Sequence, residues 1–362
     1  MTQKTPLHSS HLGLGARMVP FGGWEMPLHY GSQVSEHQVV RTDAGLFDVS
    51  HMRVLDLSGS DALLFLQSLL ANDVARLKKP GKALYSCMLR PDGGVLDDLI
   101  CYFVAKNQYR MVVNAATADK DLSWMTRQSD GYRLELVARR ELAMIAVQGP
   151  NARAKTLPLL PPGLREAAGL EPFHGLGHGD WFIARTGYTG EDGFEIILPQ
   201  SQVVGLWERL IKAGVSPCGL GARDSLRLEA GMNLYGNDMD ETISPLECGL
   251  AWTVAWEPEG RDFIGREALQ RIADNTERRH FTGLLLEDKG VLRQSMALFA
   301  GERVVGEITS GGFSPSLQRS IAMARVSADA GEDLQVELRG KRLPVRRVKL
   351  PFVRNGKAMF DF

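Results

Sequence analysis

The order of apolar and polar positions in the first half of the chain predicts alternating strands and helices. Short apolar runs bounded by turn residues indicate strands, and apolar residues at helical spacing indicate helices. The predicted strands cover residues 54–57, 83–89, 95–104, 109–113 and 133–137, and the predicted helices cover about 60–70 and 118–128. This β-α-β…β-α-β order favours a split ferredoxin-like unit.

In the middle of the chain, strands are predicted at 144–147, 181–185 and 193–198, and helices at 202–213 and 220–229. A polar stretch of mixed charge, residues 272–280, is typical of a linker. Beyond it, short alternating segments separated by glycine turns predict a small β-barrel or sandwich. These segments are 283–286, 297–299, 304–309, 321–324, 334–338 and 343–346.

Composition narrows the class of protein. The 362 residues can bury a large core, and 44% of them are hydrophobic while 23% are charged. A net charge of −1 provides no global field for nucleic acid or a membrane surface. The four cysteines have no paired spacing, so we expect free thiols in a reducing compartment and no metal site. Without an apolar signal core or membrane-length stretch, a cytoplasmic protein is predicted.

The first candidate for chemistry is a pair of adjacent carboxylates, Asp97 and Asp98. They follow a Pro-Asp-Gly-Gly turn at 91–94 and lie within the apolar run 95–104. Because successive strand residues point to opposite faces, the two carboxylates are not expected to share one environment. A carboxylate in an apolar site must find a partner, shift its pKa or serve a ligand.

A second candidate is the glycine-punctuated loop RTGYTGEDGFE at residues 185–195. Loops of this kind on a rigid scaffold often bind ligands. A hairpin with a solvated acidic tip is the alternative. On the segment alone the two interpretations are equally good for Glu195, whereas Glu191 and Asp192 are better explained as solvated acids.

Arg223 and Arg227 lie four residues apart and share one face of a predicted helix. Two guanidinium groups side by side fit an anionic ligand, because arginine offers bidentate donors that are always charged. Local pairing with Asp224, Glu229 or Glu195 explains the arrangement equally simply, and in isolation it is slightly favoured.

Taken together, these segments resemble the T-protein family of the glycine cleavage system, whose members are aminomethyltransferases. The resemblance extends over the whole chain, and its motifs are jointly specific. The matching segments are GWEMPLHY (23–30), FDVSHM (47–52), GKALYS (81–86), GGVLDDLI (93–100), AVQGP (146–150), RTGYTGEDGFE (185–195), CGLGARDSLRLEAGMNLYGNDM (218–239), ITSGGFSPSL (308–317) and FVRNGK (352–357).

The resemblance implies an α+β fold of three lobes around a central hole, with a ferredoxin-like lobe and a C-terminal β-barrel. The implied domains are 1–275, carrying the ferredoxin-like insertion at about 53–138, and 276–362. The implied reaction transfers the methylene carbon of an S-aminomethyl-dihydrolipoyl group on H-protein to tetrahydrofolate, the co-substrate. Its products are ammonia, methylenetetrahydrofolate and reduced lipoyl, and no metal takes part.

The resemblance also implies roles for individual residues. In similar proteins the second acid of the doublet is the reactive one, which is Asp98 here, and Asp97 is its structural neighbour in the site. Glu195 is the counterpart of a carboxylate that accepts the amino group and ring N–H at the pterin edge. Further folate or substrate contacts are implied for Arg223, Arg227, Arg354, Tyr85 and Tyr188.

The resemblance also brings in three other folate-dependent functions as alternatives. A folate-binding iron–sulfur maturation protein carries a KGCYxGQE motif, and the aligned segment here, RTGYTGEDGFE, has no cysteine. A folate-dependent demethylase shares the folate pocket and differs in the donor channel, so it is harder to distinguish. A methylglycine dehydrogenase is disfavoured because the chain has no flavin-type nucleotide fingerprint.

Overall fold

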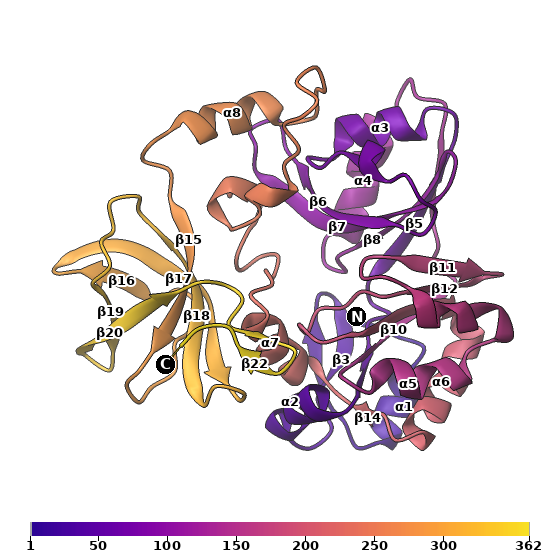
Figure 1. The fold of residues 1–362 in the computed structure, drawn as a ribbon, viewed down its shortest axis with the longest axis horizontal. Coiled ribbons are helices and arrows are strands. Elements are labelled where there is room, and N and C mark those ends of the chain that lie inside the picture. The colour runs from indigo at the N-terminus through magenta and orange to yellow at the C-terminus, as the bar shows by residue number, and fades with distance from the viewer. Residues whose placement is uncertain (1, 362) are drawn as a thin grey trace.

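The computed structural model describes residues 2–361 and contains three lobes, each built around its own sheet. The lobes surround the middle of the molecule, and the chain crosses between them from α7 (Leu220–Glu229) to α8 (Arg266–Asp274) (Figure 1). This arrangement confirms the predicted α+β fold with a ferredoxin-like lobe and a C-terminal barrel. Within the described part of the chain, no helix is long and apolar enough to cross a membrane.

The first lobe is a six-stranded sheet in the order β11-β12-β13-β10-β4-β14, flanked by helices and joined by a smaller sheet β1-β3-β2. The strands of the larger sheet are β4 (Gly45–Asp48), β10 (Leu142–Gln148), β11 (Gly175–His178), β12 (Trp181–Ala184), β13 (Gly193–Pro199) and β14 (Ser216–Pro217). The smaller sheet contains β1 (Gln3–Lys4), β2 (Arg17–Phe21) and β3 (Trp24–His29). The helices are α1 (His8–Gly13), α2 (Gln33–Thr42), α5 (Ala152–Thr156), α6 (Gln200–Lys212) and α7.

The second lobe has the predicted ferredoxin-like order. Its elements are β5 (Arg53–Ser58), α3 (Ala62–Leu69), β6 (Ala83–Leu89), β7 (Val95–Ala105), β8 (Gln108–Val113), α4 (Ala118–Gln128) and β9 (Glu135–Ala138). The sheet order β6-β7-β8-β5-β9 places the strands of the two β-α-β halves side by side, with β6 added at the edge. All neighbouring strands are antiparallel.

The third lobe is a closed barrel in the order β15-β18-β17-β16-β19-β20. Its strands are β15 (His280–Leu286), β16 (Ala297–Ala300), β17 (Arg303–Ser314), β18 (Arg319–Val326), β19 (Leu334–Leu338) and β20 (Lys341–Val348). A short hairpin of β21 (Val353–Arg354) and β22 (Lys357–Ala358) follows. Closure removes exposed sheet edges and encloses the barrel's apolar core.

Three local expectations need correction or addition. Residues 272–274 are not linker but the end of α8, because Ile272 packs with Leu269 over the turn at Gly93. His280 already belongs to β15. The hairpin β2–β3 was not predicted, since its residues are only half-buried and show little alternation. The division at 275/276 and the insertion bounds stay predictions.

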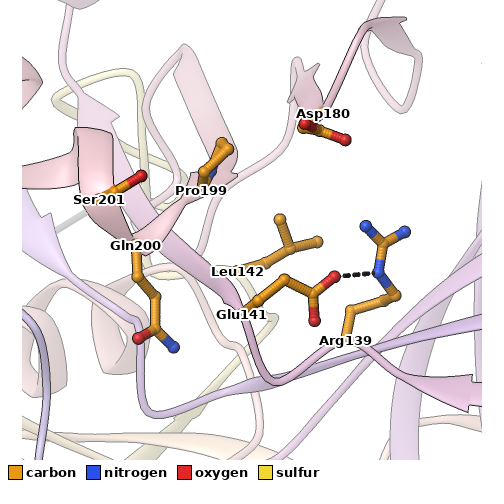
Figure 2. A pocket seen from close by; sticks show the side chains of 7 residues that line it. All are labelled: Arg139, Glu141, Leu142, Asp180, Pro199, Gln200 and Ser201. Atoms are coloured by element: carbon orange, nitrogen blue, oxygen red, sulfur yellow. Dashed lines mark hydrogen bonds and ion pairs between the residues drawn. The ribbon is translucent and has the colours of Figure 1, made fainter.

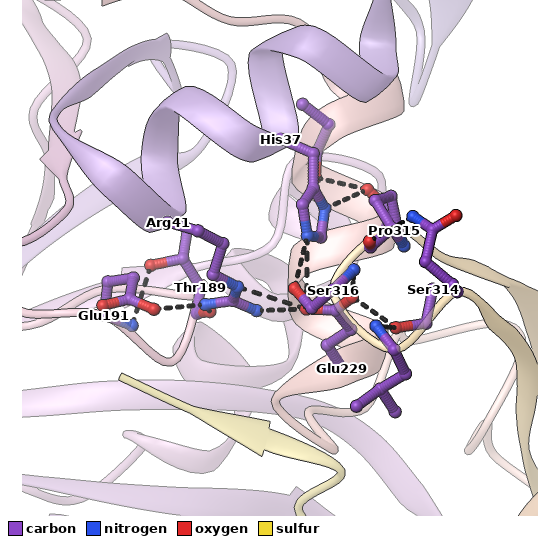
Figure 3. A network of polar contacts seen from close by, with 12 residues as sticks. His37, Arg41, Thr189, Glu191, Glu229, Ser314, Pro315 and Ser316 are labelled. Carbon is purple, nitrogen blue, oxygen red and sulfur yellow. Dashed lines mark hydrogen bonds and ion pairs between the residues drawn. The ribbon is translucent and has the colours of Figure 1, made fainter. Parts of the chain in front are cut away.

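A buried polar network connects the barrel to the first lobe (Figure 3). The Glu229 carboxylate, at the end of α7, lies 2.8 Å from Arg41 Nη2 and 3.2 Å from His37 Nε2, both on α2. Ser314, the last residue of β17, and Ser316, two residues later, donate to the same carboxylate. Burial alone would raise the pKa of Glu229, but His37 and Arg41 outweigh it and lower the pKa to about 2. The network therefore fixes α2, α7 and the barrel relative to one another.

Candidate functional site

The aspartate doublet, Asp97 and Asp98, lies near the start of β7, where this strand is bulged. The register with β6 shifts between Met88 and Leu89, which leaves Leu96 as an extra residue. A bulge bends the strand and changes where the neighbouring side chains point. The turn that precedes the doublet is therefore followed by an irregular stretch of strand.

The two carboxylates have different surroundings, as strand alternation predicts, because Thr117 donates to Asp97 and Tyr85 to Asp98, but one amide connects them. Asn114, directly after β8, donates from Nδ2 to Asp97 Oδ1 at 2.9 Å and to Asp98 Oδ1 at 2.9 Å. The bulge at Leu96 does not lie between them, because Asp97 pairs with Met88 and Asp98 with Cys87 in regular register. The shared donor is explained by the position of Asn114 at the end of β8. Asp97 is buried and accepts two further hydrogen bonds, from the Asn114 backbone N–H at 3.3 Å and the Thr117 hydroxyl at 2.9 Å.

Asp98 is the half-buried member of the pair, and its pKa is raised to about 7. Desolvation is the main cause, and the charge of Asp97 adds to it. Hydrogen bonds from the Tyr85 hydroxyl, at 2.8 Å, and from Asn114 act in the opposite direction. A carboxyl that titrates near neutral pH can give or take a proton during turnover.

Trp252, on the short 3₁₀ helix Ala251–Thr253, extends the aromatic surface beside this acid. Its ring is stacked on Tyr85, with centroids 5.7 Å apart and planes inclined by 22°. Trp252 is 65% exposed, which is unusual for so large an apolar side chain in a folded chain. The pair presents a flat apolar surface beside Asp98.

Glu195 is the acid that the first lobe contributes to the site, and it lies on β13 next to β12. Thr186 donates its hydroxyl to Glu195 Oε2 at 2.6 Å and lies 3.2 Å from the Tyr102 hydroxyl. Among residues 2–361 nothing donates to the second carboxylate oxygen, Oε1. Burial raises the pKa of Glu195, although the Thr186 hydrogen bond and the charge of Arg223 partly oppose this. One oxygen is anchored, and the other is available to a ligand.

Arg223 and Tyr188 lie between these two acids. The guanidinium of Arg223 lies over the Tyr188 ring at 4.7 Å, and within the described residues it donates no hydrogen bond to protein. Tyr188 interacts electrostatically with Asp98 and with Arg223. Both side chains line a cavity of about 520 Å³ between the β2–β3 hairpin, α7 and β17, together with Phe21 and Phe313.

Arg227 differs from its neighbour on α7 in its protein partners, and a ligand contact from it stays a prediction. It is buried and lies 2.8 Å from Asp224 and 3.0 Å from Asp238. Ser310, on β17, takes two more of its hydrogen bonds. These protein partners occupy its donors, so the local pairing considered for this arginine is what the structure shows, with Asp238 added.

Arg354 lies apart from the other predicted residues. It is exposed on β21, and none of its contacts within the described chain reaches Asp98, Glu195 or Arg223. The next residue, Asn355, donates from its backbone to the Gly190 carbonyl at 3.1 Å, which places the hairpin against the 185–195 loop. A folate contact from Arg354 stays a prediction.

A second cavity, of about 330 Å³, contains none of the predicted residues. It lies where β10 begins and α6 starts, and its lining includes Arg139, Glu141 and Asp180 (Figure 2). Arg139 Nε donates to Glu141 at 2.5 Å, so the two strongest charges in the cavity neutralise each other. This feature offers no reactive group, and the site is assigned to the region around the doublet.

The site is built from hydrogen-bonding carboxylates, one free guanidinium and aromatic surface. Over residues 2–361 no group of three or more His, Cys, Asp or Glu side chains is placed to hold a metal ion. The four cysteines are buried and free. Such an arrangement suits a flat, polar-edged heteroaromatic ligand.

Three residues of the site were not anticipated from the sequence. Asn114 had a usable signal, since it is the first polar residue after an apolar strand. Thr186 and Trp252 had none, because only the folded chain brings them beside Glu195 and Tyr85.

The comparisons with known proteins agree with this architecture. The family model described as the GCVT N-terminal domain matches residues 7–258, and the glycine cleavage T-protein C-terminal barrel domain matches residues 279–354. An aminomethyltransferase from Chromobacterium violaceum is 56% identical over 359 residues, which cover 99% of each chain. The crystal structure of the glycine cleavage system aminomethyltransferase T from Bartonella henselae superimposes with a TM-score of 0.92 at 36% identity, covering 98% of this chain and 99% of that one. The chain therefore belongs to the glycine cleavage T-protein family.

Proposed function

We propose that this protein is the aminomethyltransferase of a glycine cleavage system. It transfers the methylene carbon of the S-aminomethyl-dihydrolipoyl group on H-protein to tetrahydrofolate, and ammonia leaves. Family membership over the full chain supports the reaction class. The observation that carries the site assignment is Asp98, a carboxyl with a pKa of about 7 held by Tyr85 and Asn114.

Asp98 is the residue to which we assign the chemistry. As an anion it stabilises the positive charge that develops on the one-carbon unit when ammonia leaves, and it orients the folate nitrogens. A fixed negative charge stabilises a nearby positive charge more strongly in a poorly hydrated site than in water. Since its pKa is about 7, it can also move a proton within the site without a large energetic penalty.

Glu195, Arg223 and the two tyrosines are assigned to binding. Glu195 Oε1 accepts from the amino group and ring N–H of the pterin edge, while Thr186 holds Oε2. Arg223 donates to polar ligand atoms, because its guanidinium has no hydrogen-bond acceptor within residues 2–361. Tyr85 and Tyr188 provide ring surface near the acid, with which both interact.

Asp97 and Arg354 receive different assignments. Asp97 acts through its charge and through Asn114, and it does not touch the ligand. Arg354 is retained as a peripheral folate contact that would form when the ligand is bound. We also propose a cytoplasmic location, and a division of the chain at 275/276 with the ferredoxin-like insertion near 53–138.

A reconstituted assay tests the reaction. The protein is mixed with tetrahydrofolate and aminomethylated lipoyl H-protein, and ammonia and methylenetetrahydrofolate are measured. Equal amounts of both products that depend on protein and on folate are expected. Activity on a small methylated amine or thioether, with none on H-protein, would instead favour a folate-dependent demethylase. Tight folate binding with no turnover of either donor would favour a binding protein.

A further inference from the structure

Behind the aspartate doublet lies a third carboxyl, that of Asp121, which the proposed reaction does not use. It projects from α4 and is completely buried. Neither of its carboxyl oxygens has a hydrogen-bond donor among residues 2–361. An ionised carboxylate in such a place is strongly unfavourable, so its charge state needs an explanation.

Asp121 interacts electrostatically with Asp97, and Thr117 connects the two residues. Asp97 already accepts three hydrogen bonds, two from Asn114 and one from Thr117, and such a donor set stabilises a carboxylate. Thr117 lies one turn before Asp121 on the same helix, and its carbonyl accepts from the Asp121 backbone at 2.8 Å. Two carboxylates in contact cannot both be ionised without a large cost, so one proton must remain with the pair. The donors around Asp97 place that proton on Asp121.

We propose that Asp121 is a positioning residue, which keeps its proton in the folded protein and donates it to Asp97. Asp97 is thereby held as an anion in the geometry in which it anchors Asn114. Asn114 in turn donates to Asp98, so the reactive acid is oriented through a chain that begins at Asp121. The inference about the charge state of Asp121 does not depend on the proposed function, whereas the inference about its effect on turnover rests on that function.

The nearest cation does not change this assignment. Lys120 precedes Asp121 on α4, but its ammonium group donates to the Leu96 carbonyl, the Tyr235 hydroxyl and Glu241. Burial, followed by the charge of Asp97, raises the pKa of Asp121 to about 10, and the Thr117 hydroxyl and then the charge of Lys120 oppose this less strongly. The other titratable groups that interact with the doublet from neighbouring elements are Tyr85, Cys87, Tyr188, Tyr235 and Cys248.

The charge state is tested by unfolding equilibria as a function of pH. Asp121→Asn keeps a donor toward Asp97 and removes the titration, and Asp119→Asn, on the exposed side of the same helix, is the control. A group protonated when folded and ionised when unfolded makes the wild type less stable as pH rises. The ratio of the wild-type unfolding constant to that of Asp121→Asn should therefore rise about tenfold per pH unit between about pH 5 and pH 8. A constant ratio, as expected for Asp119→Asn, would overturn the proposal.

The positioning role is tested by the pH dependence of kcat/KM for methylene transfer. Asp121→Asn should reproduce the wild-type profile, because the amide still donates to Asp97. Asp121→Leu removes the donor to Asp97, so Asn114 is anchored less firmly and its hydrogen bond to Asp98, which lowers the pKa of that acid, weakens. The acidic limb should then move to higher pH. An unshifted limb in Asp121→Leu would refute the role even if its activity were reduced. Loss of the proposed reaction in the wild type would be recognised separately, since the unfolding experiment needs no substrate.

Discussion

The hydroxyl group of Tyr85 provides the sharpest test of how the site controls Asp98. It donates to Asp98 Oδ2 at 2.8 Å and is one of two side chains whose hydrogen bonds lower the pKa of that acid. Tyr85→Phe removes this hydrogen bond and leaves the ring that stacks on Trp252. The substitution therefore changes one proton equilibrium with little change in shape.

The size of the effect follows from the energy of the hydrogen bond. A hydrogen bond to a charged group contributes about 1.5–3 kcal/mol, and about 1.4 kcal/mol corresponds to one pKa unit. The pKa of Asp98 should therefore rise from about 7 to roughly 8–9. If the anion is the active form, kcat/KM near pH 7 should fall about 5–50-fold and recover as the pH approaches about 10.

The assay is a pH profile of kcat/KM for methylenetetrahydrofolate formation, with Tyr132→Phe as the matched control. The Tyr132 hydroxyl lies 3.2 Å from Ser68 in the same lobe and does not contact Asp98. The control should keep the wild-type acidic limb. A Tyr85→Phe profile that is lowered equally at every pH would refute the reasoning, because the hydroxyl would then act on something other than the ionisation of Asp98.

Three other predictions concern binding and stability. Glu195→Gln should weaken folate binding about 10–100-fold by calorimetry, because an amide replaces a charged acceptor; equal affinity would contradict its assignment. Arg223→Met should weaken binding with little change in stability, whereas Arg227→Met should lower the unfolding free energy by about 3–5 kcal/mol because Asp238 loses its partner. For Glu229, a lowered pKa means that the stabilisation is present above about pH 4.5 and is lost as pH falls through about 2. The stability advantage of wild type over Glu229→Gln should accordingly shrink by about 3 kcal/mol over that range in urea titrations, and a constant difference would argue against it.

The ferredoxin-like lobe and the barrel could be predicted because local pattern decides them. The two longest strands of the second lobe, β6 and β7, are mostly apolar, and the turn at 91–94 marks the hairpin between them. The barrel strands alternate and are separated by glycine turns. Local patterns of this kind survive tertiary packing when one face of each strand is buried.

The environment of the reactive acid could not be predicted in the same way. Strand alternation separates Asp97 from Asp98, but one amide, that of Asn114, donates to both carboxylates. Its position depends on how β8 pairs with β7, and a single sequence does not show that pairing.

The two arginines of α7 are a second case in which the sequence alone could not predict the surroundings of a side chain. They share spacing, charge and helix, yet Arg227 is paired with Asp238 and Ser310 while Arg223 keeps its donors free. Asp238 and Ser310 lie 11 and 83 residues further along the chain, and Ser310 belongs to the barrel, so the difference arises only in the folded protein. Sequence spacing identified both candidates and could not decide between them.

The most direct measurement of the central claim compares Asp98→Asn with wild type in the reconstituted reaction and in folate binding. The amide keeps the size of the side chain and removes the ionisable acid. Folate affinity by calorimetry should remain within a few-fold, while transfer from aminomethylated H-protein should fall by about 10²–10⁴-fold. Turnover close to that of the wild type, with folate bound normally, would contradict the assignment of the chemistry to Asp98.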